Sequence, residues 1–159
     1  MRYRRVASAV ALFLLIVHPQ DGGSANTSGH RFSQPQFRVL METLARGWNS
    51  NNATLAANCF TNDAIYSAPP DGPVRHGKRE LFEFFGGEKG RDQPMSMEWH
   101  HLIFDEATQM GAGEYTFSYK IRTHGVAIVR LVDGKIANWR EYEQASPLPW
   151  SQFIGENHF

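Results

Sequence analysis

The second half of the chain constrains the fold most, because it is an almost unbroken series of strand patterns. Four segments rich in Tyr, Phe, Trp, Val and Ile follow one another, and turn residues separate them. Asp133-Gly134, before the last segment, is a residue pair that two-residue hairpins prefer. Consecutive strands joined by short turns predict an antiparallel sheet. The four segments are residues 96–104, 112–121, 125–132 and 135–143.

Three helices are predicted ahead of these strands. Apolar residues recur at helical spacing from Phe37 to Trp48, which indicates an amphipathic helix from near Ser33 to about residues 47–51. A shorter helix is expected over residues 52–60, with Asn51 or Asn52 as its cap, and a third over residues 78–85, ended by Gly86-Gly87. A short strand, residues 64–68, lies between the last two. Helices followed by strands predict an α+β domain, with the helices packed on one face of a curved sheet that encloses a cavity.

The N-terminus has the pattern of a secretory signal peptide. Three Arg precede an apolar run, residues 6–17, and Gly23-Ser24-Ala25 provides small residues for cleavage. The run is too short to span a bilayer, which requires roughly 20 residues. We therefore expect a signal peptide over residues 1–25, a flexible lead-in over 26–32 and one domain over 33–159, with a tail from 145. The mature protein is expected to be secreted or periplasmic, with no membrane attachment after cleavage.

Composition excludes some classes of function. Of 16 basic and 16 acidic residues, cleavage would remove three Arg and one Asp, which leaves a charge of about −2 and no Lys/Arg cluster to bind nucleic acid. The single Cys59 has no partner for an intramolecular disulfide, and its apolar helical context favours an inert, buried thiol. No His pair has the spacing of a metal site, so neither a metal nor another cofactor is expected.

Side-chain alternation divides the last strand into two faces. Ile136, Asn138, Arg140 and Tyr142 fall on one face; Ala137, Trp139, Glu141 and Glu143 fall on the other. Neither set is purely apolar. This mixture fits a sheet with one face toward a cavity and the other toward solvent or a second subunit.

Five short blocks of sequence resemble the SnoaL-like branch of the nuclear transport factor 2-like superfamily, over about residues 33–144. The resemblance implies a cone-shaped α+β fold, a homodimer through the outer face of the sheet, and an apolar pocket for a small molecule. Superfamily members include polyketide cyclases, ketosteroid isomerases, dehydratases and epoxide hydrolases, so the fold alone assigns no reaction. The blocks are Trp48-Asn49, residues 61–66, residues 76–81, residues 134–136 and residues 139–142.

The same resemblance places Glu141 in the cavity, where epoxide hydrolases of this fold carry a carboxylate. Their accompanying Arg-x-Asp becomes Phe117-Ser118-Tyr119 here, and their Tyr-x-Asn becomes Tyr66-Ser67-Ala68. Epoxide hydrolysis is therefore not favoured. A carboxylate in an apolar cavity would have a raised pKa, which suits general acid or base chemistry. The ordinary alternative is a cross-strand ion pair of Glu141 with Arg130 or Lys120.

The remaining candidates follow from strand direction and side-chain type. If Glu98 and His100 face outward, then Trp99 and His101 face inward, and His101 becomes the best-placed histidine for acid–base chemistry. The tyrosines combine an aromatic body with a hydroxyl that can donate to a substrate, although each could equally be a core residue. The catalytic candidates are Glu141, Tyr66, His101 and Tyr119. The expected pocket residues are Trp48, Phe82, Phe85, Trp99, Tyr115, Phe117, Val129 and Trp139.

Two functions remain open. One is a cofactor-independent isomerase, cyclase or dehydratase in which Glu141 moves a proton. The other is a non-catalytic module that binds a hydrophobic ligand. In either case the tail residues Leu148, Trp150, Phe153 and Ile154 carry too much apolar surface to leave in water, so the tail should pack across the sheet or a partner subunit.

Overall fold

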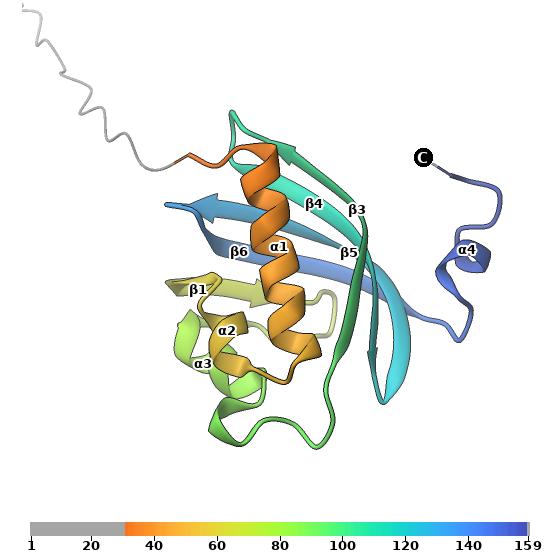
Figure 1. Ribbon diagram of the computed structural model, residues 1–159, viewed down its shortest axis with the longest axis horizontal. Helices are drawn as coiled ribbons and strands as arrows, with labels where there is room; N and C mark the ends of the chain where they lie inside the picture. Colours follow the sequence, from red (N-terminus) through yellow and green to blue (C-terminus); the bar gives the residue numbers. More distant parts are fainter. Residues whose placement is uncertain (1–30, 159) are drawn as a thin grey trace, which may run out of the picture.

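A computed structural model describes residues 31–158 as a curved, six-stranded sheet with the N-terminal helices packed on one face (Figure 1). The expected signal peptide lies outside the described residues. No helix within residues 31–158 is long and apolar enough to cross a membrane. The α+β class predicted from the sequence is confirmed, and the sheet is curved but not closed.

The N-terminal helices begin where their capping residues predict. Helix α1, Gln34–Asn49, starts after Ser33, whose backbone N–H donates to the Gln36 side chain at 2.9 Å. Helix α2, Ala53–Ala57, is capped by Asn52, whose side chain accepts from the Leu55 N–H at 2.8 Å. The two helices pack closely because Gly47 has no side chain: a Cβ there would lie 2.7 Å from the Ala56 nitrogen.

Helix α3, Gly77–Phe84, ends at two glycines with positive φ, Gly86 and Gly87, and a short 3-10 turn η1, Gly87–Lys89, follows. A strand pair not expected from the sequence precedes α3: β2, Arg75–His76, pairs with β1, Phe60–Ser67. Helix α4, Trp150–Phe153, lies in the tail, on the side of the sheet away from α1 (Figure 1).

The four long strands form a meander, as predicted. They are β3, Ser96–Asp105; β4, Met110–Tyr119; β5, Ile121–Val132; and β6, Lys135–Ala145. The sheet order is β2-β1-β6-β5-β4-β3, and β1 joins β6 in parallel although the rest is antiparallel. Asp133 and Gly134 have φ of 48° and 74°, the two positive values that a type I′ turn requires.

Two β-bulges change which side chains face inward. In β3, Trp99 is opposite Tyr115 and His101 is opposite Glu114, so His100 is an extra residue. In β6, Asn138 is opposite Arg130 and Ile136 is opposite Leu131, so Ala137 is extra. Ile136 is therefore fully buried with Trp139, and the strict alternation that put Ile136 on the outer face was wrong.

The core lies between the inner face of the sheet and helices α1 to α3. Phe37, Met41 and Leu44 of α1 are fully buried, as are Phe60 of β1 and Trp139 of β6. Aromatic rings dominate the end of this core near α3, where Trp48 packs edge-on against Phe85 and Trp139. Toward that end the packing leaves a cavity.

Candidate active site

A cavity of about 320 Å³ opens between the sheet and α3, and its walls are largely aromatic and apolar. Two carboxylates, Glu141 and Glu143, and one guanidinium, Arg91, are the charged groups among its lining residues. A few polar groups in an otherwise apolar cavity are the usual composition of a small-molecule site. The lining residues are Trp48, Tyr66, Phe84, Phe85, Arg91, Met95, Met97, Tyr115, Phe117, Tyr119, Glu141 and Glu143.

The Glu141 carboxylate accepts three hydrogen bonds from aromatic side chains. The Tyr66 hydroxyl donates to Oε1 at 2.5 Å. The Trp139 indole N–H and the Tyr115 hydroxyl both donate to Oε2, at 3.0 and 3.2 Å. Because a carboxylate offers about four acceptor positions, Oε1 keeps one unused position and Oε2 has none.

The sheet register brings these donors together. Tyr66 of β1 is opposite Trp139 of β6, and their rings stack at 5.5 Å with an interplanar angle of 5°. Tyr115 reaches Glu141 from β4 because Gly125 stands between them on β5: a Cβ at Gly125 would lie 2.8 Å from the Tyr115 hydroxyl oxygen. The site therefore depends on the parallel pairing of β1 with β6 and on a glycine in β5.

Burial raises the pKa of Glu141, because the ionised form loses hydration. The hydrogen bonds from Tyr66, Trp139 and Tyr115 act in the opposite direction, while the negative charge of Glu143 raises this pKa further. The net direction is upward from the ordinary value of 4.5. Burial and the adjacent Glu141 charge likewise raise the pKa of the Tyr66 and Tyr115 hydroxyls, so both stay protonated as donors.

Glu143 is a second carboxylate on the same cavity wall, two residues further along β6. Its Oε2 accepts a hydrogen bond from the Thr123 hydroxyl of β5 at 2.9 Å. The site therefore has a buried carboxyl with a raised pKa beside an exposed one. Such a pair in two environments is a common arrangement for proton transfer.

The mouth of the cavity carries Tyr119 and Arg91. The Tyr119 hydroxyl donates to Asp92 Oδ1 at 2.6 Å, and that hydrogen bond lowers the pKa of Asp92. The Arg91 guanidinium lies 4.7 Å from the centre of the Tyr119 ring, in a cation–π contact. Tyr119 is thus at the cavity, as the sequence suggested, but its hydroxyl is directed to the rim.

His101 does not join this site. The bulge at His100 reverses the side-chain direction beyond it, so Trp99 points inward as expected and His101 does not. The His101 Nδ1 lies 2.8 Å from Glu114 Oε2, at a separate surface hollow that includes Ile103 and Val126. The inward direction predicted for His101 was therefore wrong, because strict alternation fails at an extra residue.

Four of the eight expected pocket residues line the cavity: Trp48, Phe85, Tyr115 and Phe117. The other four, Phe82, Trp99, Val129 and Trp139, pack in or against the core behind it. Trp139 acts on the site indirectly, through its hydrogen bond to Glu141.

Sequence reasoning did not select Phe84, Arg91 or Glu143 for the site. Glu143 could have been found, because it shares the inward face of its strand with Glu141. Arg91 could not, because it lies in a polar loop with no periodicity. Its place is set by Asn51, whose side chain accepts from the Arg91 N–H and donates to the Arg91 carbonyl, both at 2.9 Å.

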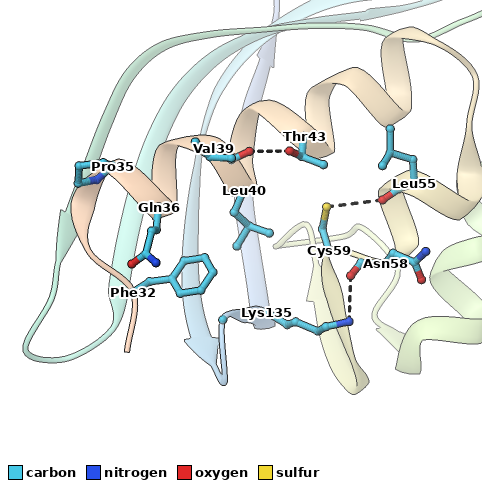
Figure 2. A pocket seen from close by; sticks show the side chains of 11 residues that line it. Phe32, Pro35, Gln36, Val39, Leu40, Thr43, Leu55, Asn58, Cys59 and Lys135 are labelled. Carbon is cyan, nitrogen blue, oxygen red and sulfur yellow. Dashed lines mark hydrogen bonds between the residues drawn. The ribbon is translucent and has the colours of Figure 1, made fainter. Parts of the chain in front are cut away.

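A second cavity, of about 460 Å³, lies between α1 and the start of β6 (Figure 2). Its described lining residues include no carboxylate and no histidine, so this cavity lacks a general acid or base comparable to Glu141. Cys59 is buried there with its Sγ 3.6 Å from the Leu55 carbonyl, and burial raises its pKa to about 11. This thiol is protonated near neutral pH, in agreement with the inert role expected from the sequence. The lining residues are Phe32, Pro35, Gln36, Val39, Leu40, Thr43, Leu55, Asn58, Cys59, Gly134 and Lys135.

Comparison with solved structures shows the same fold in proteins of low sequence identity. An NTF2-like protein of unknown function from Burkholderia xenovorans is 16% identical, with a TM-score of 0.61 over 79% of this chain and 97% of that one. A candidate ketosteroid isomerase from Kribbella flavida is 18% identical, with a TM-score of 0.59 over 79% and 91%. An epoxide hydrolase from M. tuberculosis is 15% identical, with a TM-score of 0.60 over 70% and 84%.

No protein with a curated description matches the sequence. The SnoaL-like domain profile, in contrast, matches residues 41–139, which is more than half of the chain and includes Tyr66, Tyr115 and Trp139. The fold and the profile agree with each other. The chain therefore belongs to the SnoaL-like domain family, within the NTF2-like fold.

Proposed function

We propose that the protein is a cofactor-independent enzyme that transfers a proton within a small apolar substrate, in an isomerisation, cyclisation or dehydration. The single observation that carries this proposal is the Glu141 carboxylate, half-buried in an apolar cavity with one acceptor position of Oε1 unused. The family's isomerase-like and epoxide-hydrolase-like neighbours are compatible with acid–base chemistry.

Glu141 is the proposed base. Its raised pKa lies closer to neutral pH than that of an ordinary carboxyl group, and a carboxylate with a higher pKa is a stronger proton acceptor. The unused position of Oε1 is the proposed acceptor of the substrate proton, and Tyr66, which already donates to that oxygen, stabilises the ionised form of the base. Burying a carboxylate without partners costs several kcal/mol, and hydrogen bonds to a charged group each contribute about 1.5–3 kcal/mol. Three donors are therefore enough to keep the group usable in an apolar cavity.

Glu143 and the tyrosines are the proposed partners of the base. The exposed Glu143 can exchange protons with solvent and return one to the product side of the substrate. Tyr66 and Tyr115 donate to the Glu141 carboxylate and so orient the base. By the sequence resemblance, Phe117 and Tyr119 take the positions at which epoxide hydrolases of this fold have an Arg and an Asp, which disfavours opening of an epoxide by water.

The test measures proton transfer directly. A β,γ-unsaturated cyclic ketone, 3-cyclohexenone, is incubated with the protein in D2O. Its conversion to the conjugated isomer is followed by the ultraviolet absorption of the enone, and its uptake of deuterium is followed by mass spectrometry. We expect Glu141→Gln to lower the rate by about 10²–10⁴-fold. Glu98→Gln, an exposed change on β3, is the control and should leave the rate unchanged. Equal rates for wild type and Glu141→Gln would refute the assignment.

One observation favours the alternative of a non-catalytic binding module. All three donors to Glu141 come from buried core residues, as expected for a carboxylate that only holds the sheet together. In that case a hydrophobic ligand would copurify unmodified with the cavity occupied, and native mass spectrometry of the purified protein would detect it.

We also propose that the protein is exported and forms a homodimer. The sequence of residues 1–25 supports export, and the intact mass of the mature chain tests it. Ile103, 68% exposed on the outer face of the sheet, supports a dimer in which two outer faces meet.

A further inference from the structure

A second hollow adjoins the Glu141 cavity and is lined by three arginines. It has a volume of about 530 Å³ and its lining includes Arg75, Arg79 and Arg91. Phe84 and Arg91 line both this hollow and the Glu141 cavity, so the two adjoin at these side chains. One molecule could therefore occupy both.

Two of the three arginines, Arg75 and Arg91, are held in place by aromatic contacts instead of ion pairs. The Arg75 guanidinium lies 3.9 Å from the centre of the Phe84 ring, and the Arg91 guanidinium lies 5.4 Å from the same ring centre. Arg91 also donates from Nη2 to the Phe84 carbonyl. Within residues 31–158 the ion pair that the structure records is His101–Glu114, so none of the three guanidiniums is neutralised by a carboxylate.

Unused hydrogen-bond donors accompany these uncompensated charges. The Nε atoms of Arg75 and Arg91 are buried, and neither has a hydrogen-bond partner in the described part of the chain. Two buried arginine donors without partners are unusual, since buried polar groups are nearly always satisfied. The Nη groups of Arg75 and Arg79 also have no hydrogen bond within residues 31–158, so these more outward groups keep donor capacity for a ligand.

The two carboxylates in this hollow are turned to other groups. Glu80 Oε2 accepts from the His76 N–H at 2.6 Å, at the start of α3. Glu83 lies against Gly87, where its Oε2 would be 2.8 Å from a Cβ. Three arginines against two glutamates, neither of which forms an ion pair within residues 31–158, leave a net positive hollow beside an apolar cavity.

We propose that this arginine hollow is an anion subsite, and that the ligand of the Glu141 cavity is an amphipathic molecule with an apolar body and a carboxylate, sulfonate or phosphate group. The inference rests on the proposed small-molecule role of the Glu141 cavity. The apolar body lies among Met97, Phe117 and Tyr115, and the acidic group lies against Arg75 and Arg79, with Arg91 between the two parts. Planar guanidiniums suit such anions, because they offer paired donors.

The test compares two dyes that differ by one sulfonate. 1-Anilinonaphthalene-8-sulfonate is anionic, and N-phenyl-1-naphthylamine is its neutral counterpart. Both are titrated into the purified protein, and fluorescence gives each Kd. We expect the sulfonate to bind about tenfold more tightly. The variants Arg75→Gln and Arg79→Gln should abolish this preference while the Kd of the neutral dye stays unchanged. Arg130→Gln, on the exposed part of β5, is the matched control and should preserve the preference.

Two results would overturn the proposal. One is equal affinity for the two dyes, or no binding of either. The other is a preference that survives in the Arg75→Gln/Arg79→Gln double variant. A Met97→Phe or Met95→Phe change, which narrows the apolar cavity, should weaken both dyes; dyes whose Kd neither change affects bind elsewhere and also refute the proposal. Failure here is distinct from failure of the catalytic proposal, which is measured by the turnover of Glu141→Gln.

Discussion

At the scale of single residues, Glu141 shows how one carboxyl group is made tolerable and useful in an apolar environment. Its ionised form loses hydration, and three aromatic donors replace part of that hydration. The balance still raises its pKa, because hydrogen bonds of ordinary length do not fully compensate for burial. The raised pKa of this one residue should make the unfolding free energy depend measurably on pH.

The pH dependence of the unfolding free energy tests whether the pKa of Glu141 is raised. Below pH 4.5 the carboxyl is protonated in both the folded and the unfolded chain. As the pH rises, the unfolded chain ionises first, so the folded wild type loses stability until the pH passes the raised pKa. Glu141→Gln cannot ionise, and its amide can still pair with Tyr66 and Trp139. We therefore expect its urea midpoint, relative to that of the wild type, to rise with pH above about 4.5.

The other carboxylates cancel in this comparison. Asp92 and Asp105 have lowered pKa values, from hydrogen bonds to Tyr119 and Thr108, but they are present in both proteins. Glu98→Gln is the matched control at an exposed position on β3, outside the site, and its difference from wild type should lack the rising trend. A difference between Glu141→Gln and wild type that is flat from pH 4 to 8 would contradict the raised pKa.

Much of this residue-level picture could be predicted from the sequence, and the two errors in it have separate causes. Glu141 and Tyr66 were selected from strand direction and resemblance, and they do meet in the structure. His101 was misplaced because one inserted residue at His100 inverts the pattern, and a bulge has no reliable sequence signature. Arg91 was missed because a side chain from Asn51, 40 residues away, positions its loop.

At the scale of elements, the C-terminal tail is attached to the outer face of the sheet by a row of polar and aromatic contacts. His100 Nε2 lies 2.7 Å from the Thr116 hydroxyl, which lies 2.9 Å from His124 Nδ1. His124 Nε2 is 2.9 Å from the Leu148 carbonyl, and the Trp150 ring stacks on His100 at 4.1 Å. The packing of the tail across the sheet, expected from its apolar residues, is thus seen at Trp150.

Removing one ring should release the tail. Trp150→Ala loses the stack on His100 and the contact with His124, whose ring centre is 5.6 Å from that of Trp150. We expect faster amide hydrogen exchange over residues 146–157 and a loss of about 1–3 kcal/mol of unfolding free energy. Leu148→Ala is the control, because Leu148 is 43% exposed and contacts His124 through its backbone carbonyl. Equal exchange rates in Trp150→Ala and wild type would show that this ring does not hold the tail.

At the scale of the whole molecule, the helices cover the inner face of the sheet and the tail covers only part of the outer one (Figure 1). The uncovered part includes Ile103 and Tyr142, which are 68% and 44% exposed. The order of helices and strands could be predicted because each element carries its own periodicity. The parallel pairing of β1 with β6 could not, because it depends on two segments that are distant in sequence.

If two outer faces meet, a charge at the centre of the uncovered patch should separate them. Ile103→Glu is expected to convert a dimer to a monomer, because it would bury unpaired carboxylates in an apolar interface. Sedimentation velocity measures the change, and Val39→Glu, on the helical side at 59% exposure, is the control. A wild type that sediments as a monomer would refute the dimer.

The stacked pair of Tyr66 and Trp139 also has a consequence for the order of folding. Tyr66 lies on β1, the first strand in the chain, and Trp139 lies on β6, the last. Tyr66 is also 75 residues from the Glu141 that it contacts. Contacts of such long range form late, because the intervening chain must first be ordered. The environment of Glu141 therefore arises only when β1 docks beside β6, and partly folded chains cannot have a working site. Near-ultraviolet circular dichroism of this ring pair would then report completion of the fold, after the β3–β6 meander has formed.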